Sequence, residues 1–439
     1  MYYRLLPALF CLGCLDFDHF LPAPPPPSDA ATDLSGTVQD LAPTGPDLRV
    51  KVLGPPPVFP GDKVVSLKLT HCEEPLALAA GNFQAMLGSD RMGLAVGCSG
   101  RNVNLMRQDY GTAILTRTSP AKQHPVAFLQ QTVFSQTNTA TLALAAGRID
   151  GDAYLDLVVA NGTQLLLLKG IGEGSFQPPV VLATNSAALG LNPPGGLFPV
   201  MTVGDLNGDL VDEIVLGAAV LNGPATPAVA LRLGSELKSS VVYGSPFSRL
   251  LLQNFGNSSP DLVMIKKHPG GNNFMTSLFH SDGKQFTGQD ISTGYSSSSE
   301  IRDIAVADFD EDGKADLAIA HNESTTGKIL LQLGQGGGSF STVHKVADVP
   351  NTLAAMITAD FNNDAFADLA VLCNGQVLVY AGKGNATFTS PAVLVPPAPG
   401  SYALLAADFD QDGKVDLAVT QGIANLDDGV AFFVNETPL

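Results

Sequence analysis

The 439-residue sequence lacks tryptophan and is poor in charge, because only 15% of its residues are Asp, Glu, Lys or Arg. Bases are the scarcer kind: 24 Lys and Arg stand against 42 Asp and Glu, which gives a net charge of −18. A chain this acidic is repelled by nucleic acid and by anionic membrane surfaces. The composition therefore argues against both classes of partner.

The sequence also lacks the motifs of the common catalytic sites. It contains no H-E-x-x-H, G-x-S-x-G, haem-type C-x-x-C-H or P-loop motif, and its seven histidines are not paired at ligand spacing. No long helical pattern appears, whereas 45 glycines and 31 prolines interrupt short apolar runs. The sequence predicts an all-β chain without a recognisable catalytic centre.

A short acidic loop is the most informative element that the sequence does contain. In "DFDEDGKADLAIA", which begins at Asp308, aspartates occupy loop positions 1, 3, 5 and 9. Oxygens at alternate positions, with a backbone carbonyl at position 7, suit calcium, which takes roughly six to eight oxygen ligands in irregular geometry. Position 12 is the apolar Ile319, and both flanks have the pattern of strands, so an EF-hand does not fit.

The loop recurs along the chain with a period of about fifty residues, which is typical of propeller blades. The predicted calcium ligands at positions 1, 3, 5, 7 and 9 of the four best copies are Asp308, Asp310, Asp312, Lys314 and Asp316; Asp360, Asn362, Asp364, Phe366 and Asp368; Asp408, Asp410, Asp412, Lys414 and Asp416; and Asp205, Asn207, Asp209, Val211 and Glu213. Weaker copies occupy residues 82–93, 148–156 and 254–261.

A glycine-rich turn repeats with the same period. "GIGEGSF", "GQGGGSF" and "GKGNATF" end at Phe176, Phe340 and Phe388, and each lies between strand-like runs with no helix after it. The glycines therefore indicate hairpin turns with positive φ and not a phosphate-binding loop. The predicted fold is an all-β, seven-bladed β-propeller of four-stranded antiparallel blades, with calcium loops between strands 1 and 2.

The two ends of the predicted propeller complement each other. The last unit lacks its outer strand, while a spare strand, "KVVSLKLT", precedes the first unit. A bare apolar edge such as "VAFFV" invites aggregation. We therefore expect residues 64–69 to pair with residues 430–434 and close the ring.

These loops and turns resemble FG-GAP or VCBS repeats, the repeats of the integrin α-subunit propeller and of many bacterial extracellular proteins. The resemblance covers residues 72–439 and implies that the loops bind Ca²⁺ and that a ring face recognises a partner. Loop 148–156 departs from the family pattern because Arg148 takes position 1. We expect its guanidinium to reach Asp150, Asp152 or Asp156 and to replace the missing cation.

The first residues predict export. Residues 1–14 hold one arginine and an apolar run that is too short to span a bilayer but suits a signal peptide. "CLGC" resembles a bacterial lipobox, which would make Cys14 the lipidated residue, and the alternative is an ordinary signal peptide cleaved nearby. The proline-rich residues 15–61 are expected to form a disordered, semi-rigid tether for a head formed by residues 62–439.

Three further cysteines lie in the predicted head. Cys72 and Cys98 flank the first two strands of the first unit, and antiparallel pairing would bring them together. We expect a disulfide between them, as suits an exported protein. Cys373 stands alone at the end of a strand, and we expect it to be a buried apolar residue and not a nucleophile.

The sequence thus predicts a non-enzymatic calcium-binding propeller, exported to the cell envelope as an outer-membrane lipoprotein or secreted. Its monomeric head would bind a protein or glycan at the cell surface, with a lipid anchor as its only membrane contact. Two alternatives stay open, because a fold does not define a function. One is a propeller-based hydrolase or lyase acting on polysaccharide, and the other is an architectural module of an envelope complex.

Overall fold

The computed structural model describes twenty segments of the chain: residues 55–59, 64–68, 75–83, 92–98, 102–108, 128–135, 141–161, 164–184, 200–206, 208–217, 229–233, 236–240, 247–255, 260–267, 274–281, 286–291, 300–395, 403–410, 412–421 and 429–437. Their regular secondary structure is entirely β, so the all-β prediction is confirmed for them. Within these segments no helix has the length and apolar character needed to cross a membrane.

The described strands form seven four-stranded antiparallel sheets and one two-stranded hairpin. The first four sheets consist of β2 (Pro75–Gly81), β3 (Gly93–Cys98), β4 (Asn102–Gln108) and β5 (Phe128–Ser135); of β6 (Thr141–Gly147), β7 (Asp156–Asn161), β8 (Gln164–Leu168) and β9 (Val180–Thr184); of β10 (Val200–Gly204), β11 (Glu213–Gly217), β12 (Val229–Leu233) and β13 (Glu236–Ser240); and of β14 (Phe247–Gln253), β15 (Asp261–Lys267), β16 (Phe274–Ser281) and β17 (Phe286–Ile291).

The remaining sheets follow the same order, with one exception in the last. They consist of β18 (Glu300–Ala307), β19 (Asp316–Glu323), β20 (Thr326–Gln332) and β23 (His344–Val349); of β24 (Leu353–Ala359), β25 (Asp368–Cys373), β26 (Gln376–Tyr380) and β27 (Ala392–Leu394); and of β28 (Leu404–Ala407), β29 (Asp416–Gln421), β30 (Gly429–Phe433) and β1 (Val64–Lys68). The hairpin is β21 (Gly334–Gly336) with β22 (Ser339–Phe340).

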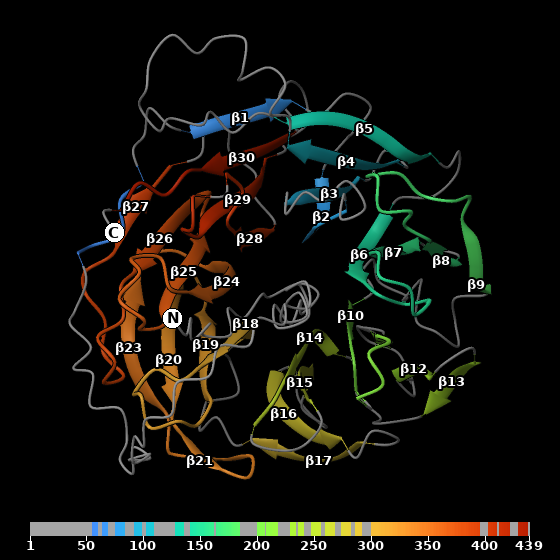
Figure 1. Cartoon of the computed structure of the whole chain (residues 1–439). Coiled ribbons are helices and arrows are strands. Elements are labelled where there is room, and N and C mark those ends of the chain that lie inside the picture. Colours follow the sequence, from blue (N-terminus) through green and yellow to red (C-terminus); the bar gives the residue numbers. More distant parts are fainter. Residues whose placement is uncertain are drawn as a thin grey trace, which may run out of the picture.

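The sheets lie around a common centre, with the first strand of each sheet innermost and the fourth at the rim (Figure 1). Each second strand is sandwiched between its neighbours, and β3, β7, β25 and β29 are buried along their whole length. This explains why these strands are continuous apolar runs instead of alternating ones. The arrangement is consistent with a β-propeller type of fold.

The last sheet takes its outer strand from the other end of the described chain. β1 pairs antiparallel with β30, from Val64 opposite Phe433 to Lys68 opposite Gly429. The expected pairing of residues 64–69 with 430–434 is therefore confirmed over these five pairs. It joins residues 369 positions apart, since 433 − 64 = 369.

Residues 55–59, predicted to be part of the tether, contact the segment that follows β30 and the β24–β25 loop. The N–H of Val58 donates to Oγ1 of Thr437 at 2.8 Å, and the N–H of Glu436 donates to the carbonyl of Val58 at 2.8 Å. The ring of Phe59 packs edge-on against Phe361 at a centroid distance of 6.1 Å. Val58 and Phe59 therefore belong to the head, because the backbone of Val58 and the ring of Phe59 are held by it.

Several expectations lie outside the described residues: the signal segment 1–14 with Cys14, the tether up to residue 54, Asn207 and Cys72. Cys98 is buried and disulfide-bonded, but a bond to Cys72 stays a prediction. Cys373 is a free, buried thiol, as expected. Burial raises its pKa, which disfavours a nucleophilic role.

Candidate metal centres in the acidic loops

Position 9 is acidic in every loop except residues 82–93, and this acid fastens the loop to its sheet. In the β18–β19 loop, Asp316 is fully buried at the start of β19. Its Oδ2 accepts a hydrogen bond from the N–H of Phe309 at 2.8 Å, and its Oδ1 accepts one from the N–H of Gly334 at 2.7 Å. One carboxylate therefore joins the loop to the turn that follows the third strand of the same sheet.

The same bonds recur around the ring. The closing acids and the residues whose N–H groups bind them are Asp156 with Ile149 and Gly170, Glu213 with Leu206, Asp261 with Phe255, Asp368 with Phe361 and Gly382, and Asp416 with Phe409 and Asn435. Asp261 keeps this bond although its loop has lost the other acids. The closing acid therefore has a backbone-binding role that does not depend on a metal.

The glycine turns carry out two different tasks. A Cβ on Gly334 would lie 2.2 Å from the carbonyl oxygen of Ala315, so only glycine brings its N–H so close to Asp316. Gly336, two residues on, has a φ of 84° and is needed for the turn itself. The expectation of positive φ is thus correct for the second glycine, whereas the first is required by close backbone approach.

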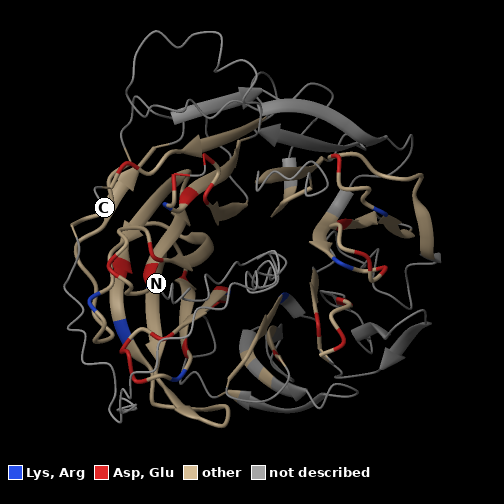
Figure 2. Ribbon diagram, in the orientation of Figure 1, with Lys and Arg blue, Asp and Glu red and all other residues tan. Residues whose placement is uncertain are grey.

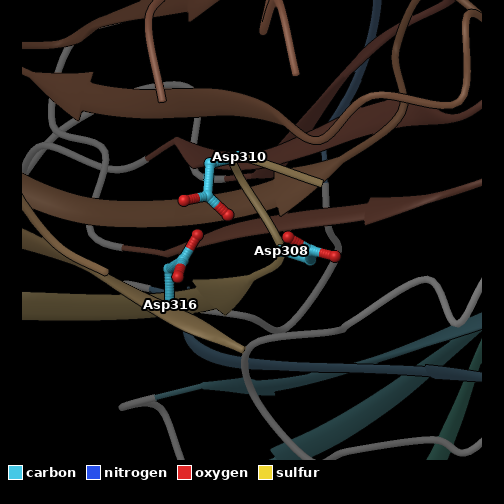
Figure 3. A group of neighbouring side chains, drawn as sticks. All are labelled: Asp308, Asp310 and Asp316. Atoms are coloured by element: carbon cyan, nitrogen blue, oxygen red, sulfur yellow. The ribbon is translucent and has the colours of Figure 1, made fainter. Parts of the chain in front are cut away.

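Two loops bring three carboxylates together. The oxygens of Asp308, Asp310 and Asp316 lie within 4.8 Å of one another, and so do those of Asp408, Asp410 and Asp416. We call these sets the β18–β19 triad and the β28–β29 triad. Figure 3 shows the carboxylates of Asp310 and Asp316 pointing toward each other, with Asp308 beside them. The triads occupy positions 1, 3 and 9, which are three of the five predicted ligand positions.

The position-5 acids are not part of the triads. Lys314 Nζ lies 2.6 Å from Oδ2 of Asp312, and Lys414 Nζ lies 3.0 Å from Oδ2 of Asp412. The other oxygen of each acid accepts the N–H of the same lysine, at 2.9 and 3.0 Å. The position-7 lysine, predicted to offer only its carbonyl, therefore also neutralises the acid two residues before it.

The other two predicted calcium loops have an asparagine at position 3, where the triads have an aspartate. Asp360 accepts the N–H groups of Asp364 and Ala365, and Asp364 accepts a bond from the Asn362 amide at 3.0 Å and the N–H of Phe366 at 2.9 Å. In the β10–β11 loop, Asp205 accepts three backbone N–H groups and Asp209 accepts that of Val211. Among the His, Cys, Asp and Glu side chains of the described residues, only the two triads bring three ligand atoms within 4.8 Å of one another.

Burial opposes negative charge in these loops. It raises the pKa of Asp316 to about 6 and that of Asp368 to about 8, in both cases more than the backbone N–H donors lower it. Burial likewise raises the pKa of Asp416 well above its usual range, and Asp410 adds to that rise. Acidic residues recur in the loops around the ring (Figure 2). A bound cation would offset the cost of ionising them.

The prediction for Arg148 is wrong. Within the described residues, no ion pair joins its guanidinium to Asp150, Asp152 or Asp156; its backbone N–H instead donates to Asp212 at 2.7 Å. The cation beside Asp150 is Lys169, whose Nζ lies 3.1 Å from Oδ2. Arg148 is held by the next acidic loop, because its carbonyl also accepts the N–H of Asp212 at 2.9 Å.

The last sheet uses an asparagine where other sheets use the first glycine of a turn. The N–H of Asn435 binds Asp416 at 2.7 Å, and its Nδ2 donates to the carbonyls of Phe361 at 2.7 Å and Val415 at 3.0 Å. Its Oδ1 accepts the N–H and Oγ1–H of Thr437. Sequence reasoning missed Asn435 and Lys169, although both stand immediately around the end of a third strand.

Comparisons with known proteins support the predicted FG-GAP repeats over part of the chain. Residues 308–371 and 360–419 match the family model of the FG-GAP-like repeat. This supports the FG-GAP family for the stretch that contains both triads. No curated protein sequence matches the chain.

Two solved structures are similar to the chain at a low level. One is an Agrocybe aegerita lectin, described as recognising non-reducing terminal N-acetylglucosamine, and the other is BBS1N in complex with ARL6DN, soaked with mercury. Both are 15% identical with a TM-score of 0.49; the matches cover 85% of this chain and 94% and 97% of the other chains, respectively. Neither similarity carries an argument about what this chain binds.

Proposed function

We propose that the protein is a non-enzymatic, calcium-stabilised interaction module, built as a closed seven-bladed propeller of FG-GAP repeats. Seven four-stranded sheets and the β1–β30 pairing support this blade number and closure. The repeat match to residues 308–419 supports the family. Repeats of this kind form interaction modules, and no motif in the sequence favours an enzyme.

The β18–β19 triad is the observation that carries the calcium proposal. It offers oxygen donors only, it combines three carboxylates within 4.8 Å, and Asp316 is fully buried. Oxygen-only donors of this charge and irregular spacing suit calcium better than zinc or copper, which prefer nitrogen and sulfur. Asp308, Asp310 and Asp316 would hold one ion, and Asp408, Asp410 and Asp416 a second; the β24–β25 and β10–β11 loops are weaker candidates.

The proposed role of the ion is to stiffen the ring. The closing acid of each triad already binds one backbone N–H group in the loop and one just after the third strand of the same sheet, so a cation on it would strengthen links that exist. A rigid head on a proline-rich tether, anchored through Cys14 or secreted, would present its loops to a protein or glycan outside the cell. Purified head tested against native cell envelopes, with calcium and with chelator, would identify that partner.

Metal binding is tested first by melting and elemental analysis. At a dissociation constant of roughly 10⁻⁴ to 10⁻³ M, about 1 mM calcium stabilises the head by about 0.4–1.4 kcal/mol per site, which corresponds to about 0.5–2 °C per site for a domain of this size. The double variant Asp310→Asn, Asp410→Asn should lose most of that shift. Asp348→Asn, an exposed acid outside the loops, is the control. Equal melting with calcium and chelator, with no metal in the protein, would overturn the proposal.

A further inference from the structure

We propose that the β6–β7 loop is held without a metal, because Lys169 supplies the positive charge that calcium would supply to the two triads. The inference rests on the proposed function only where it compares Lys169 with the calcium ions of the two triads. The ammonium group of Lys169, at the end of β8, neutralises the carboxylate of Asp150 in the β6–β7 loop.

The loop does not fit a metal. Position 1, an aspartate in both triads, is Arg148, whose backbone is bonded to Asp212 on both its N–H and its carbonyl. Asp152 is exposed and accepts the N–H of Tyr154 at 2.7 Å. Among the described residues, the acids of this loop do not form a group with oxygens within 4.8 Å of one another. The donor set that calcium would need is therefore incomplete here.

Lys169 is placed to balance the remaining charge. Its Nζ lies 3.1 Å from Oδ2 of Asp150, the position-3 acid, and Oδ1 of Asp150 accepts the N–H of Asp152. Two-thirds of the lysine side chain and most of the Asp150 side chain are shielded from solvent. An ion pair shielded in this way is screened less than one on the surface.

Lys169 differs in charge from the residues at the same position in three other units. Lys169 immediately precedes Gly170, which binds the closing acid Asp156. In the β18–β19, β24–β25 and β28–β29 units, the residues that precede the corresponding donor are Leu333, Ala381 and Val434. Among these four units, a charged residue thus appears at this point only in the one whose loop has lost its position-1 acid.

A double-mutant cycle in chelator tests the inference. Lys169→Met should lower the melting temperature by roughly 2 °C, and Lys169→Met with Asp150→Asn should regain most of that loss, because a neutral amide needs no counter-charge. Lys345→Met, which breaks an exposed pair with Asp348, is the control and should change little. A loss no larger than the control, or one that persists in the double variant, would overturn the inference.

A second measurement uses the wild-type lysine. Asp150→Asn should leave the number of bound calcium ions unchanged, whereas Asp310→Asn should reduce it. Loss of one ion in Asp150→Asn would overturn the inference. If wild-type protein binds no calcium at all, the proposed function fails, while the cycle in chelator still decides the role of Lys169.

Discussion

Asn435 should be the most sensitive single position at the ring closure. Its side chain is fully buried and takes part in four hydrogen bonds, with Phe361, Val415 and both donors of Thr437. Asn435→Ala removes all four and leaves buried polar groups without partners. Thr437 is itself fully buried, so water does not reach it easily.

The expected loss follows from these contacts. A net hydrogen bond contributes about 1 kcal/mol, and a buried group left unpaired costs about 1–3 kcal/mol. Bonds that share one side chain are not additive, so we expect about 3–5 kcal/mol for Asn435→Ala. An unfolding entropy of about 2.1 cal/mol/K per residue gives ~0.8 kcal/mol/K for a head of this size, and hence a fall in melting temperature of about 4–6 °C.

The chain contains a matched control. Asn385 is also the first residue of an Asn-x-Thr triplet, and its Oδ1 accepts the same two donors, from Thr387, but at an exposed turn. Asn385→Ala should lower the melting temperature by about 1 °C or less, because water replaces its bonds. Calorimetry on both variants decides the matter: equal shifts would refute the reasoning that the buried contacts of Asn435 hold the last sheet to the neighbouring β24–β25 loop.

Three other outcomes are expected. The calcium-induced rise in melting temperature should be larger at about pH 8.5 than at about pH 5.5, because calcium must displace protons from Asp316 and Asp368, whose pKa values burial raises to about 6 and about 8. The chelated protein should instead lose stability as pH rises, since its folded state binds more protons than the unfolded state over that range. A thermal scan that shows the same calcium shift at both pH values would count against this. Phe59→Ala should cost about 2–4 kcal/mol in denaturant titration, by removing the ring that packs on Phe361, and a loss under about 0.5 kcal/mol would mean that the contact is unimportant. Deleting residues 62–70 should give an aggregation-prone head in light scattering, whereas deleting 15–54 should not; equally monodisperse products would contradict the closure.

The sequence allows the triads and the closing strand to be predicted because both depend on local pattern. Asp308, Asp310 and Asp316 stand at fixed positions within one loop, and the repeat exposes their spacing. The closing strand follows from counting strands per unit. The pairing of Lys314 with Asp312 is equally local and could have been expected, because a lysine two residues after an acid competes for it.

Side-chain contacts between separate strands and loops could not be predicted from the sequence in the same way. Lys169 reaches Asp150 only because the end of β8 lies beside the β6–β7 loop, and sequence spacing does not tell which residue before the turn points toward the acids. Arg148 was the nearer base in sequence, but its position is determined by Asp212 in the following sheet. The contacts of Asn435 and Phe59 with Phe361 appear only once the residues on either side of β1 and β30 are placed beside the β24–β25 loop.

The pairing of β1 with β30 also sets an order of events during synthesis. The ribosome makes β1 first and its partner last, and at roughly 5–20 residues per second the separation of 369 positions between Val64 and Phe433 takes about 20–70 s. For that time the edge of β1 has no native partner, while each intervening sheet can form from contiguous chain. Closing so long a loop is also entropically costly. The ring can therefore close only as the final step of folding, and a chaperone that shields residues 64–68 during that interval would protect the whole molecule.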